Sequence, residues 1–398
     1  MNSSLDISLS QARKIALYTQ CLNSRREFSA GINGTLATIE HLGYVQIDTL
    51  AVVERAHNHT LWNRVDGFEP EQIDQLQQAG KIFEHWAHAL AYLPTSNYRY
   101  SLPMMNRIAN GESHWYPKNS KDTKRVLKRI QEEGPLSAKD FTDKKSSTSM
   151  WSRSPSKHAL EQLFMEGELM IPKRVNFHKV YDLRERVLSS DINTNMPTEK
   201  ELCGHLVIQY LKANGIGQIK EFSYLRKGLG NTFNQVVNEL AEAGEIIPVS
   251  ININPSTEAP TANYYCLPES VLLIEKKLPS GLLRILSPFD NAVIQRKRLE
   301  QLFDYDYQIE CYVPQAKRKY GYFCLPILYN SSMVGRIDAK ADRKNRSLHI
   351  IHLHIEKPIR GLDRFYQKLN KELENFATFN HCETVELHSV SGAQRPNW

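Results

Sequence analysis

The sequence predicts an α+β protein, because a helix–strand pattern occurs three times and a run of short apolar segments follows it. In each copy, apolar residues three apart indicate an amphipathic helix, which ends at a glycine and leads into a short apolar strand. The glycines are Gly80, Gly167 and Gly244, so the copies lie a small domain apart. Repetition at such intervals indicates tandem modules.

The pattern also indicates the kind of module. A helix that is closed by glycine and followed at once by a strand is how the last helix of a winged helix enters its wing. We therefore predict three tandem winged-helix modules, in residues 1–112, 113–190 and 191–270. The glycine-closed helix and the strand after it fall near the end of each module.

Other local signals fit these modules. Ser8 is suited to cap the first helix, and Ser137 to start a short helix after a turn. Thr198 and Glu201 have the spacing of a capping box before a third-module helix. In that module we expect the wing to turn through residues 254–260.

After about residue 270, short apolar runs separated by polar turns dominate the chain. The runs are Leu282–Leu286, Ala292–Ile294, Gln308–Val313, Tyr322–Tyr329, Met333–Ile337 and Ser347–Ile355. One helix at 360–376 and a strand at 384–388 close this region. We predict a fourth module in residues 271–398 that is β-rich and barrel-like.

Composition narrows the class of protein. The 398 residues leave room for two to four domains, and the net charge of +6 only weakly favours an anionic partner. Basic residues cluster at 118–129, 296–298, 317–319 and 336–346. The six cysteines form no CxxC pair, which argues against a zinc finger or a disulfide framework. With no signal-like start and no long apolar run, we expect a cytoplasmic protein without a membrane partner.

The segment Gln46-Ile47-Asp48 is the main candidate for chemistry. In an extended chain, Gln46 and Asp48 share one face and Ile47 points to the other. A carboxylate can accept a proton from a water molecule that the neighbouring carboxamide orients. The pair can thus support hydrolysis without a metal, although two polar residues around an isoleucine also occur on any half-exposed strand.

Several motifs, spread over nearly the whole chain, carry a family resemblance. They lie at residues 44–49, 54–59, 83–88, 286–291, 317–322 and 334–343. With these motifs in this order, the chain resembles the bacterial DNA glycosylases that unhook interstrand crosslinks, the AlkZ and YcaQ family. The resemblance implies three winged helices and a β-barrel around a C-shaped, DNA-holding concavity. It also implies a catalytic Gln-apolar-Asp motif of the YcaQ branch, here Gln46 and Asp48.

The resemblance predicts a DNA repair glycosylase that hydrolyses the N-glycosidic bond of cationic N7-alkylguanine, including crosslinked guanine. Because no lysine belongs to the motif, we expect a monofunctional enzyme without a cofactor. We expect it to act as a monomer on damaged double-stranded DNA, associated with the nucleoid when bound. The alternative is a non-catalytic winged-helix transcriptional regulator, which tandem modules equally permit.

Further residues are candidates for DNA contact. Arg55, His57 and His59 can reach phosphates or sugar near the motif, or the two histidines can be core or surface residues. The basic run Lys317-Arg318-Lys319 is suited to phosphate contact at a hairpin tip, or forms a solvated turn. Arg336 belongs to the last family motif and is assigned to DNA with it.

The remaining histidines are interpreted as structural. His85 and His88 flank an apolar pair and are assigned to packing first. On a regular strand, His352 and His354 share a face that His349 does not. With no supporting carboxylate or cysteine in the local sequence, we expect no metal site.

Overall fold

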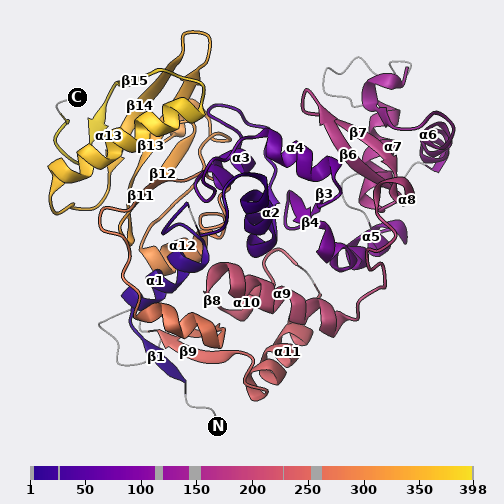
Figure 1. Ribbon diagram of the computed structural model, residues 1–398, viewed down its shortest axis with the longest axis horizontal. Coiled ribbons are helices and arrows are strands. Elements are labelled where there is room, and N and C mark those ends of the chain that lie inside the picture. The colour runs from indigo at the N-terminus through magenta and orange to yellow at the C-terminus, as the bar shows by residue number, and fades with distance from the viewer. Residues whose placement is uncertain are drawn as a thin grey trace.

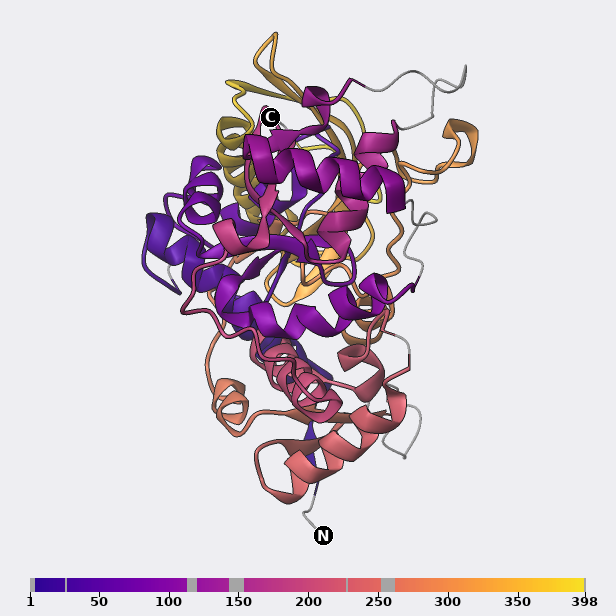
Figure 2. The ribbon, with the colours of Figure 1, turned by 90° about the vertical axis from the view of Figure 1, so that its right-hand side faces the viewer.

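The computed structural model describes residues 4–25, 27–112, 120–142, 154–226, 228–251 and 262–396. Three small helical units and a large C-terminal sheet make up the molecule, and the second unit and that sheet lie at opposite ends of its long axis (Figure 1). Seen from the side, the third unit lies at one end together with the N-terminus (Figure 2). Among these residues, every helix is too short or too polar to cross a bilayer.

The first unit carries the Gln-Ile-Asp segment. Its elements are α2 (Gly31–Leu42), β2 (Val45–Gln46), α3 (Ala56–Trp62), α4 (Glu71–Gln78), β3 (Ile82–Trp86), β4 (Leu90–Pro94), the 3-10 helix Thr95–Ser101 and α5 (Leu102–Ala109). The sheet order is β2-β4-β3, so the short strand β2 borders the second strand of the hairpin.

The second and third units repeat this plan. The second contains α6 (Ser120–Glu133), β5 (Leu136–Ser137), the 3-10 helix Ala138–Asp140, α7 (Pro155–Met165), β6 (Leu169–Val175), β7 (His178–Leu183) and α8 (Arg184–Val187). The third contains α9 (Glu199–Asn214), β8 (Ile216–Gly217), α10 (Ile219–Phe222), α11 (Gly230–Glu242), β9 (Ile247–Ile251) and β10 (Ala262–Cys266). The orders β5-β7-β6 and β8-β10-β9 match the first sheet.

The local signals that defined the repeat are confirmed. Gly80, Gly167 and Gly244 follow α4, α7 and α11 with positive φ angles, a conformation that glycine adopts without steric cost. Ser8 and Thr198 cap α1 and α9 through capping boxes, and Ser137 caps the 3-10 helix with Asp140. The predicted turn at 254–260 lies outside the described residues.

The N-terminal segment packs against the third unit. Strand β1 (Leu5–Ile7) pairs in parallel with β9, and α1 (Leu9–Thr19) buries Ile15 and Leu17 in a cluster with Val249. The segment therefore completes a sheet whose other strands come more than 200 residues later.

The C-terminal sheet is open, so the expectation of a barrel is wrong. The 3-10 helices Pro268–Ile274 and Gln315–Lys317 and helix α12 (Arg296–Phe303) lie among or before its strands. The strands are β11 (Leu283–Ile285), β12 (Cys324–Tyr329), β13 (Ser332–Asp342), β14 (Ser347–Ile355), β15 (Thr384–Leu387) and β16 (Val390–Ser391), and α13 (Leu362–Phe379) covers one face. Their order is β11-β12-β13-β14-β15, with β16 also on β14. The runs at 292–294 and 308–313, predicted as strands, are turns and irregular chain, so nothing joins the two edges.

A bulge in β14 changes which histidines share a face. The pairing with β13 shifts at Ile351, which is an extra residue on its strand. An extra residue reverses the alternation of side chains. His349, His352 and His354 therefore all lie half-buried on one face, opposite the buried Ile350, although a regular strand would separate His349 from the other two.

A buried ion pair joins the first unit to the segment before α12. The Arg64 guanidinium donates to both oxygens of Asp290 at 2.7 Å, and both side chains are fully buried. Arg64 also donates to the carbonyl oxygens of Gln20 and Thr60 at 2.8 Å. One side chain therefore ties α3, the end of α1 and the chain around Asp290 together.

The hairpin of the second unit docks on the first unit through its tip. The Phe177 ring stacks on the buried His57 ring, with ring centroids 5.8 Å apart. The guanidinium groups of Arg55 and Arg174 lie 4.1 and 4.4 Å from the same ring. Arg174 also donates to both oxygens of the buried Glu84 at 2.7 and 2.6 Å. This contact joins the two units by stacking and charge.

We predict that Arg64→Met lowers the free energy of unfolding by about 3–5 kcal/mol, because it leaves the buried Asp290 carboxylate without its partner. Urea denaturation measures the change. Lys200→Met, which removes an ion pair between half-exposed side chains, is the control and should change stability little. Adding Asp290→Leu to Arg64→Met should recover part of the loss. If Arg64→Met were as stable as Lys200→Met, the role of the buried pair would be contradicted.

Candidate active site

The end of α2 and the start of β2 position the Gln-Ile-Asp segment. Gly43 ends the helix with φ +78°, and a Cβ atom there would lie 2.6 Å from the Gln209 side chain. The segment then pairs with β4, and the Ile47 N–H donates to the carbonyl oxygen of Leu90 in β4 at 2.8 Å. Ile47 is buried in the core of the unit. Gln46 is the last residue of β2, and Asp48 follows the buried Ile47 just beyond the strand.

The Gln46 carboxamide is held by a histidine that the sequence did not connect with it. The Nε2 atom of His88 lies 2.9 Å from Gln46 Oε1. The His88 ring packs edge-on against Tyr44 and is tilted against Tyr224 of the third unit. Burial, with a smaller effect of the Arg226 charge, lowers the pKa of His88 to about 4. A neutral His88 thus donates to Gln46 and fixes the orientation of the carboxamide.

Asp48 is a half-buried carboxylate with one oxygen engaged. Its Oδ1 accepts the N–H of Leu50 at 2.7 Å. Burial raises the pKa of Asp48 above its ordinary value, and the hydrogen bond from Leu50 opposes that shift. A carboxylate with a raised pKa is a stronger base than an exposed one, and such groups gather at functional sites.

The C-terminal module faces this carboxylate. Burial raises the pKa of Cys311 and of Tyr312, and the nearby Asp48 charge raises both further. Tyr312 is 75% exposed and so presents an aromatic ring to solvent beside Asp48. Asn291 Nδ2 donates to the Tyr44 carbonyl oxygen at 3.0 Å, which ties the strand to the same module. The site is therefore formed between modules that are distant in sequence.

A cavity of about 120 Å³ is lined in part by His88. Its walls include Tyr44, His88 and Tyr224, together with His205 and Arg226 of the third unit. Gln46 and Asp48 are not among its lining residues. The candidate catalytic pair thus lies outside this cavity.

The basic run of the C-terminal module lies in a loop whose backbone a buried glutamate holds. The Glu310 carboxylate accepts three backbone N–H groups, those of Lys319, Tyr320 and Gly321. Burial acts to raise the pKa of Glu310, but these donors outweigh it and hold that pKa below its ordinary value. Lys317 and Lys319 are exposed, and Arg318 is half-buried with its Nε donating to the Val313 carbonyl oxygen.

Three of the residues assigned to DNA from the sequence are turned inward. His57 stacks on Phe177 with 3% of its surface exposed, and His59 is fully buried with Nε2 2.8 Å from the Ile285 carbonyl oxygen. Arg336, 2% exposed, donates to Glu356 and to the Asp306 carbonyl oxygen. Since a duplex cannot reach a buried side chain, we correct these assignments to packing.

Arg55 and the other basic runs differ in exposure. Arg55 is half-buried over the Phe177 ring. In α6, the basic side chains of Arg125, Lys128 and Arg129 pair with acidic neighbours on the same helix, and Lys118 lies outside the described residues. Arg298 is buried against Glu221. Lys317 and Lys319, by contrast, are exposed and lie on the same segment as Tyr312, whose pKa is raised by burial and by the Asp48 charge.

Comparisons with known proteins bear on the family and the fold of the chain. The family model described as DNA glycosylase AlkZ-like matches residues 39–379, which include the Gln-Ile-Asp segment and strands β11 to β14 of the C-terminal sheet. The fold is similar to that of the Streptomyces sahachiroi DNA glycosylase AlkZ, with a TM-score of 0.63 and 15% sequence identity. That match covers 97% of this chain and all of the other. At this level of identity the match shows a shared fold.

We predict that the protein loses stability as the pH falls from about 6.5 towards about 4. Burial, the main cause, lowers the pKa of His57 to about 3 and those of His59 and His88 to about 4. In this range the unfolded chain takes up protons that the folded chain excludes, so acid favours unfolding. Urea denaturation at a series of pH values measures the effect.

A matched pair of variants tests the cause of this pH dependence. His57→Gln should reduce the slope of stability against pH, whereas His381→Gln, at an exposed histidine, should leave it unchanged. A stability that is constant between neutral pH and about pH 5 would show that these rings take up protons without unfolding.

Proposed function

This chain belongs to the AlkZ-like DNA glycosylase family, and we propose that it hydrolyses the N-glycosidic bond of cationic N7-alkylguanines in damaged double-stranded DNA. The observation that carries the proposal is the pairing of a half-buried carboxylate, Asp48, with a carboxamide, Gln46, that His88 holds in place. We extend the proposal to guanines in interstrand crosslinks. On this proposal the enzyme is a monomer of the cytoplasm and a monofunctional glycosylase.

The chemistry of the lesion suits this small set of groups. An N7-alkylguanine carries a positive charge, so the base leaves with the electrons of the glycosidic bond as a neutral molecule and needs no general acid. A water molecule supplies the new C1′–O bond. Asp48 Oδ1 already accepts the Leu50 N–H, so we assign Oδ2 to accept the proton of that water.

Asp48 also acts on the sugar, and Gln46 acts on the water that attacks it. As the base departs, positive charge develops at C1′ of the deoxyribose. The ionised Asp48 stabilises this charge electrostatically, and its partly dry surroundings strengthen the effect. Gln46, held by His88, orients the water for attack. Because a lysine is not part of this group, the product is an abasic site in the DNA strand, and no Schiff base forms with the protein.

Access to the lesion favours an open site. A crosslinked base stays attached to the opposite strand, so extruding it into a closed pocket is costly. On this proposal the crosslinked base is attacked in place in the duplex, and the cavity lined by His88 takes no part in the reaction. We further propose that the three repeated units are winged helices and that they form a C-shaped surface around the duplex with the C-terminal module.

The loop that carries Lys317, Arg318 and Lys319 is our proposed phosphate contact. Glu310 holds its backbone, and Tyr312 of the same segment presents an exposed ring beside Asp48. A rigid cationic loop can fix the duplex relative to the carboxylate without reading sequence. Arg55, half-buried over Phe177, is a further contact that we propose at the junction of the first two units.

Base release from defined duplexes tests the function. We expect the purified protein to release 7-methylguanine and to unhook a nitrogen-mustard-type crosslink, but to leave uracil in place, because uracil carries no charge that activates its departure. Chromatography of the released bases measures the outcome. Efficient release of uracil, or none of 7-methylguanine, would reject the assigned substrate class.

We predict that Asp48→Asn lowers the single-turnover rate of 7-methylguanine release by about 10²-fold or more, because it removes the base. Gln46→Ala should lose less, since water can be oriented in other ways. Asp363→Asn, at an exposed aspartate of α13, is the control. The raised pKa of Asp48 adds a second signature. As the pH is lowered, the rate should begin to fall at a higher pH than it would with an exposed aspartate as the base. Near-wild-type activity of Asp48→Asn would overturn the mechanism.

We predict that Lys317→Ala with Lys319→Ala weakens binding to undamaged duplexes of any sequence and flattens its dependence on salt. The log–log slope should become less negative by about 0.9 for each phosphate that the loop no longer neutralises. Lys368→Ala, at an exposed lysine on α13, should leave the slope as it is. Fluorescence anisotropy over a series of salt concentrations gives both slopes. If the double variant and Lys368→Ala give the same slope, the loop does not bind the phosphates.

A further inference from the structure

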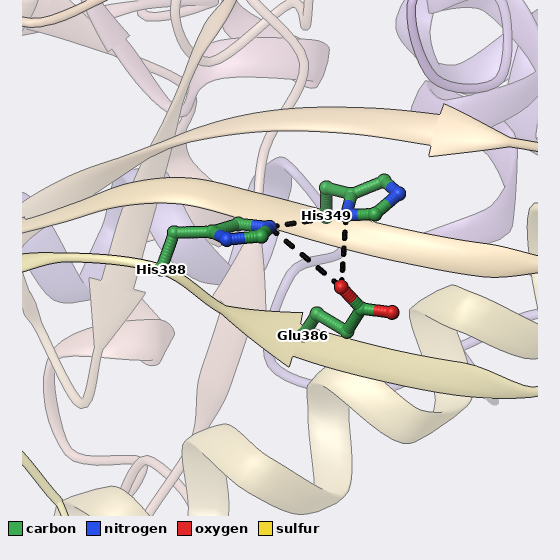
Figure 3. A group of neighbouring side chains, drawn as sticks. All are labelled: His349, Glu386 and His388. Atoms are coloured by element: carbon green, nitrogen blue, oxygen red, sulfur yellow. Dashed lines mark hydrogen bonds and ion pairs between the residues drawn. The ribbon is translucent and has the colours of Figure 1, made fainter.

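The outer face of the C-terminal sheet brings together two histidines and a glutamate that are not part of the proposed catalytic site. His349 lies on β14, and Glu386 on β15 is its direct partner in the parallel pairing. His388 follows Glu386 by two residues, just beyond the end of β15, and returns to the same face. Figure 3 shows the three side chains converging on one point between them.

The bulge at Ile351 does not create this meeting but places it within a longer row of histidines. His352 and His354 lie further along the same face. They are engaged elsewhere, because the His352 ring nitrogens lie 2.8 Å from the hydroxyls of Ser389 and Ser391, and the latter also contacts His354. His349 and His388 instead direct nitrogen atoms at each other and at a carboxylate.

The distances between the three ligand atoms suit a single ion. His349 Nδ1 lies 3.0 Å from His388 Nε2 and 3.3 Å from Glu386 Oε2, and His388 Nε2 lies 3.9 Å from the same oxygen. Ligand atoms at about 2.0–2.2 Å from a tetrahedral zinc ion are about 3.3–3.5 Å apart, close to the mean of these distances. Only small rotations of exposed side chains are needed to equalise them.

We propose that His349, Glu386 and His388 form a binding site for a divalent transition metal ion, with zinc as the preferred class. Two imidazoles and one carboxylate are ligands for Zn²⁺, Co²⁺ and Ni²⁺, whereas Mg²⁺ and Ca²⁺ prefer oxygen atoms alone. Three protein ligands leave one tetrahedral position to water, because the group lies at the surface.

The surroundings of the glutamate support a built site. Ser347 Oγ donates to Glu386 Oε1 at 3.0 Å, so the other oxygen, Oε2, is the one directed at the two histidines. A hydrogen bond to the second oxygen of a ligating carboxylate orients the ligand and strengthens binding. Ser347 and His349 lie two residues apart on β14, and a single strand thus provides both a ligand and the group that orients another.

A metal ion here would tie the end of the chain to the sheet. β15 and β16 reach β14 only after α13, and they pair with it in parallel over a few residues. The ion would add a cross-link between β14 and the chain around β15. The site stands apart from Gln46 and Asp48, so the proposal does not depend on the proposed glycosylase function.

Zinc titration of the chelator-treated protein tests the proposal. We expect one equivalent of Zn²⁺ to bind in competition with a chromophoric chelator, and Mg²⁺ not to compete. His349→Ala, His388→Ala and Glu386→Gln should each weaken binding by at least about tenfold. His352→Ala, in the same row of histidines but not among the ligands, is the matched control and should keep the wild-type affinity.

Cobalt spectroscopy and thermal unfolding make the outcome specific. Co²⁺ should give the visible bands of a tetrahedral nitrogen–oxygen site without a thiolate charge-transfer band, which separates this site from binding at the free cysteines. Zn²⁺ should raise the melting temperature of the wild type but not of His349→Ala with His388→Ala. Failure to bind one equivalent, equal affinity in that double variant, or equal loss in His352→Ala would overturn the proposal.

Discussion

The buried pair of Arg64 and Asp290 is the interaction on which the arrangement of this molecule depends. It lies where the first unit, the N-terminal helix and the chain before α12 meet, and the guanidinium also satisfies the Gln20 and Thr60 carbonyls. Two charges removed from water are stable only when nearly all their hydrogen bonds are made, so the geometry at this junction has little freedom. Asn291, the neighbour of Asp290, donates to Tyr44 and thereby extends that constraint to the strand that carries Gln46.

Rigidity of this kind suits a site that is assembled from distant parts of the chain. Gln46 is oriented by His88, whose ring is packed against Tyr224 of the third unit, while Asp48 faces Tyr312 of the C-terminal module. No single unit contains the whole group. On the proposed mechanism, Asp48 needs neighbours that do not rearrange during the reaction, because preorganised charge stabilises a transition state most effectively.

Local sequence signals predicted what local forces determine. The glycines that end α4, α7 and α11 were predictable because positive φ angles strongly favour that residue. The barrel was wrong because apolar runs at 292–294 and 308–313 look like strands but form turns and irregular chain. The contact of His88 with Gln46 and the meeting of His349 with Glu386 were not predictable, since strand pairing and tertiary packing create both. The inward turn of His57, His59 and Arg336 has the same cause.

The pairing of β1 with β9 sets an order on the assembly of the chain. Residues 5–7 are synthesised more than 200 residues before their partner strand, which ends at residue 251. At synthesis rates of 5–20 residues per second, the first strand waits roughly ten to fifty seconds for that partner. Until it docks, β9 is a bare edge whose backbone groups can pair with another nascent chain. Strand β1 is thus among the last elements to enter the fold, and a bulky group placed next to it would act on folding yield and not on the candidate site.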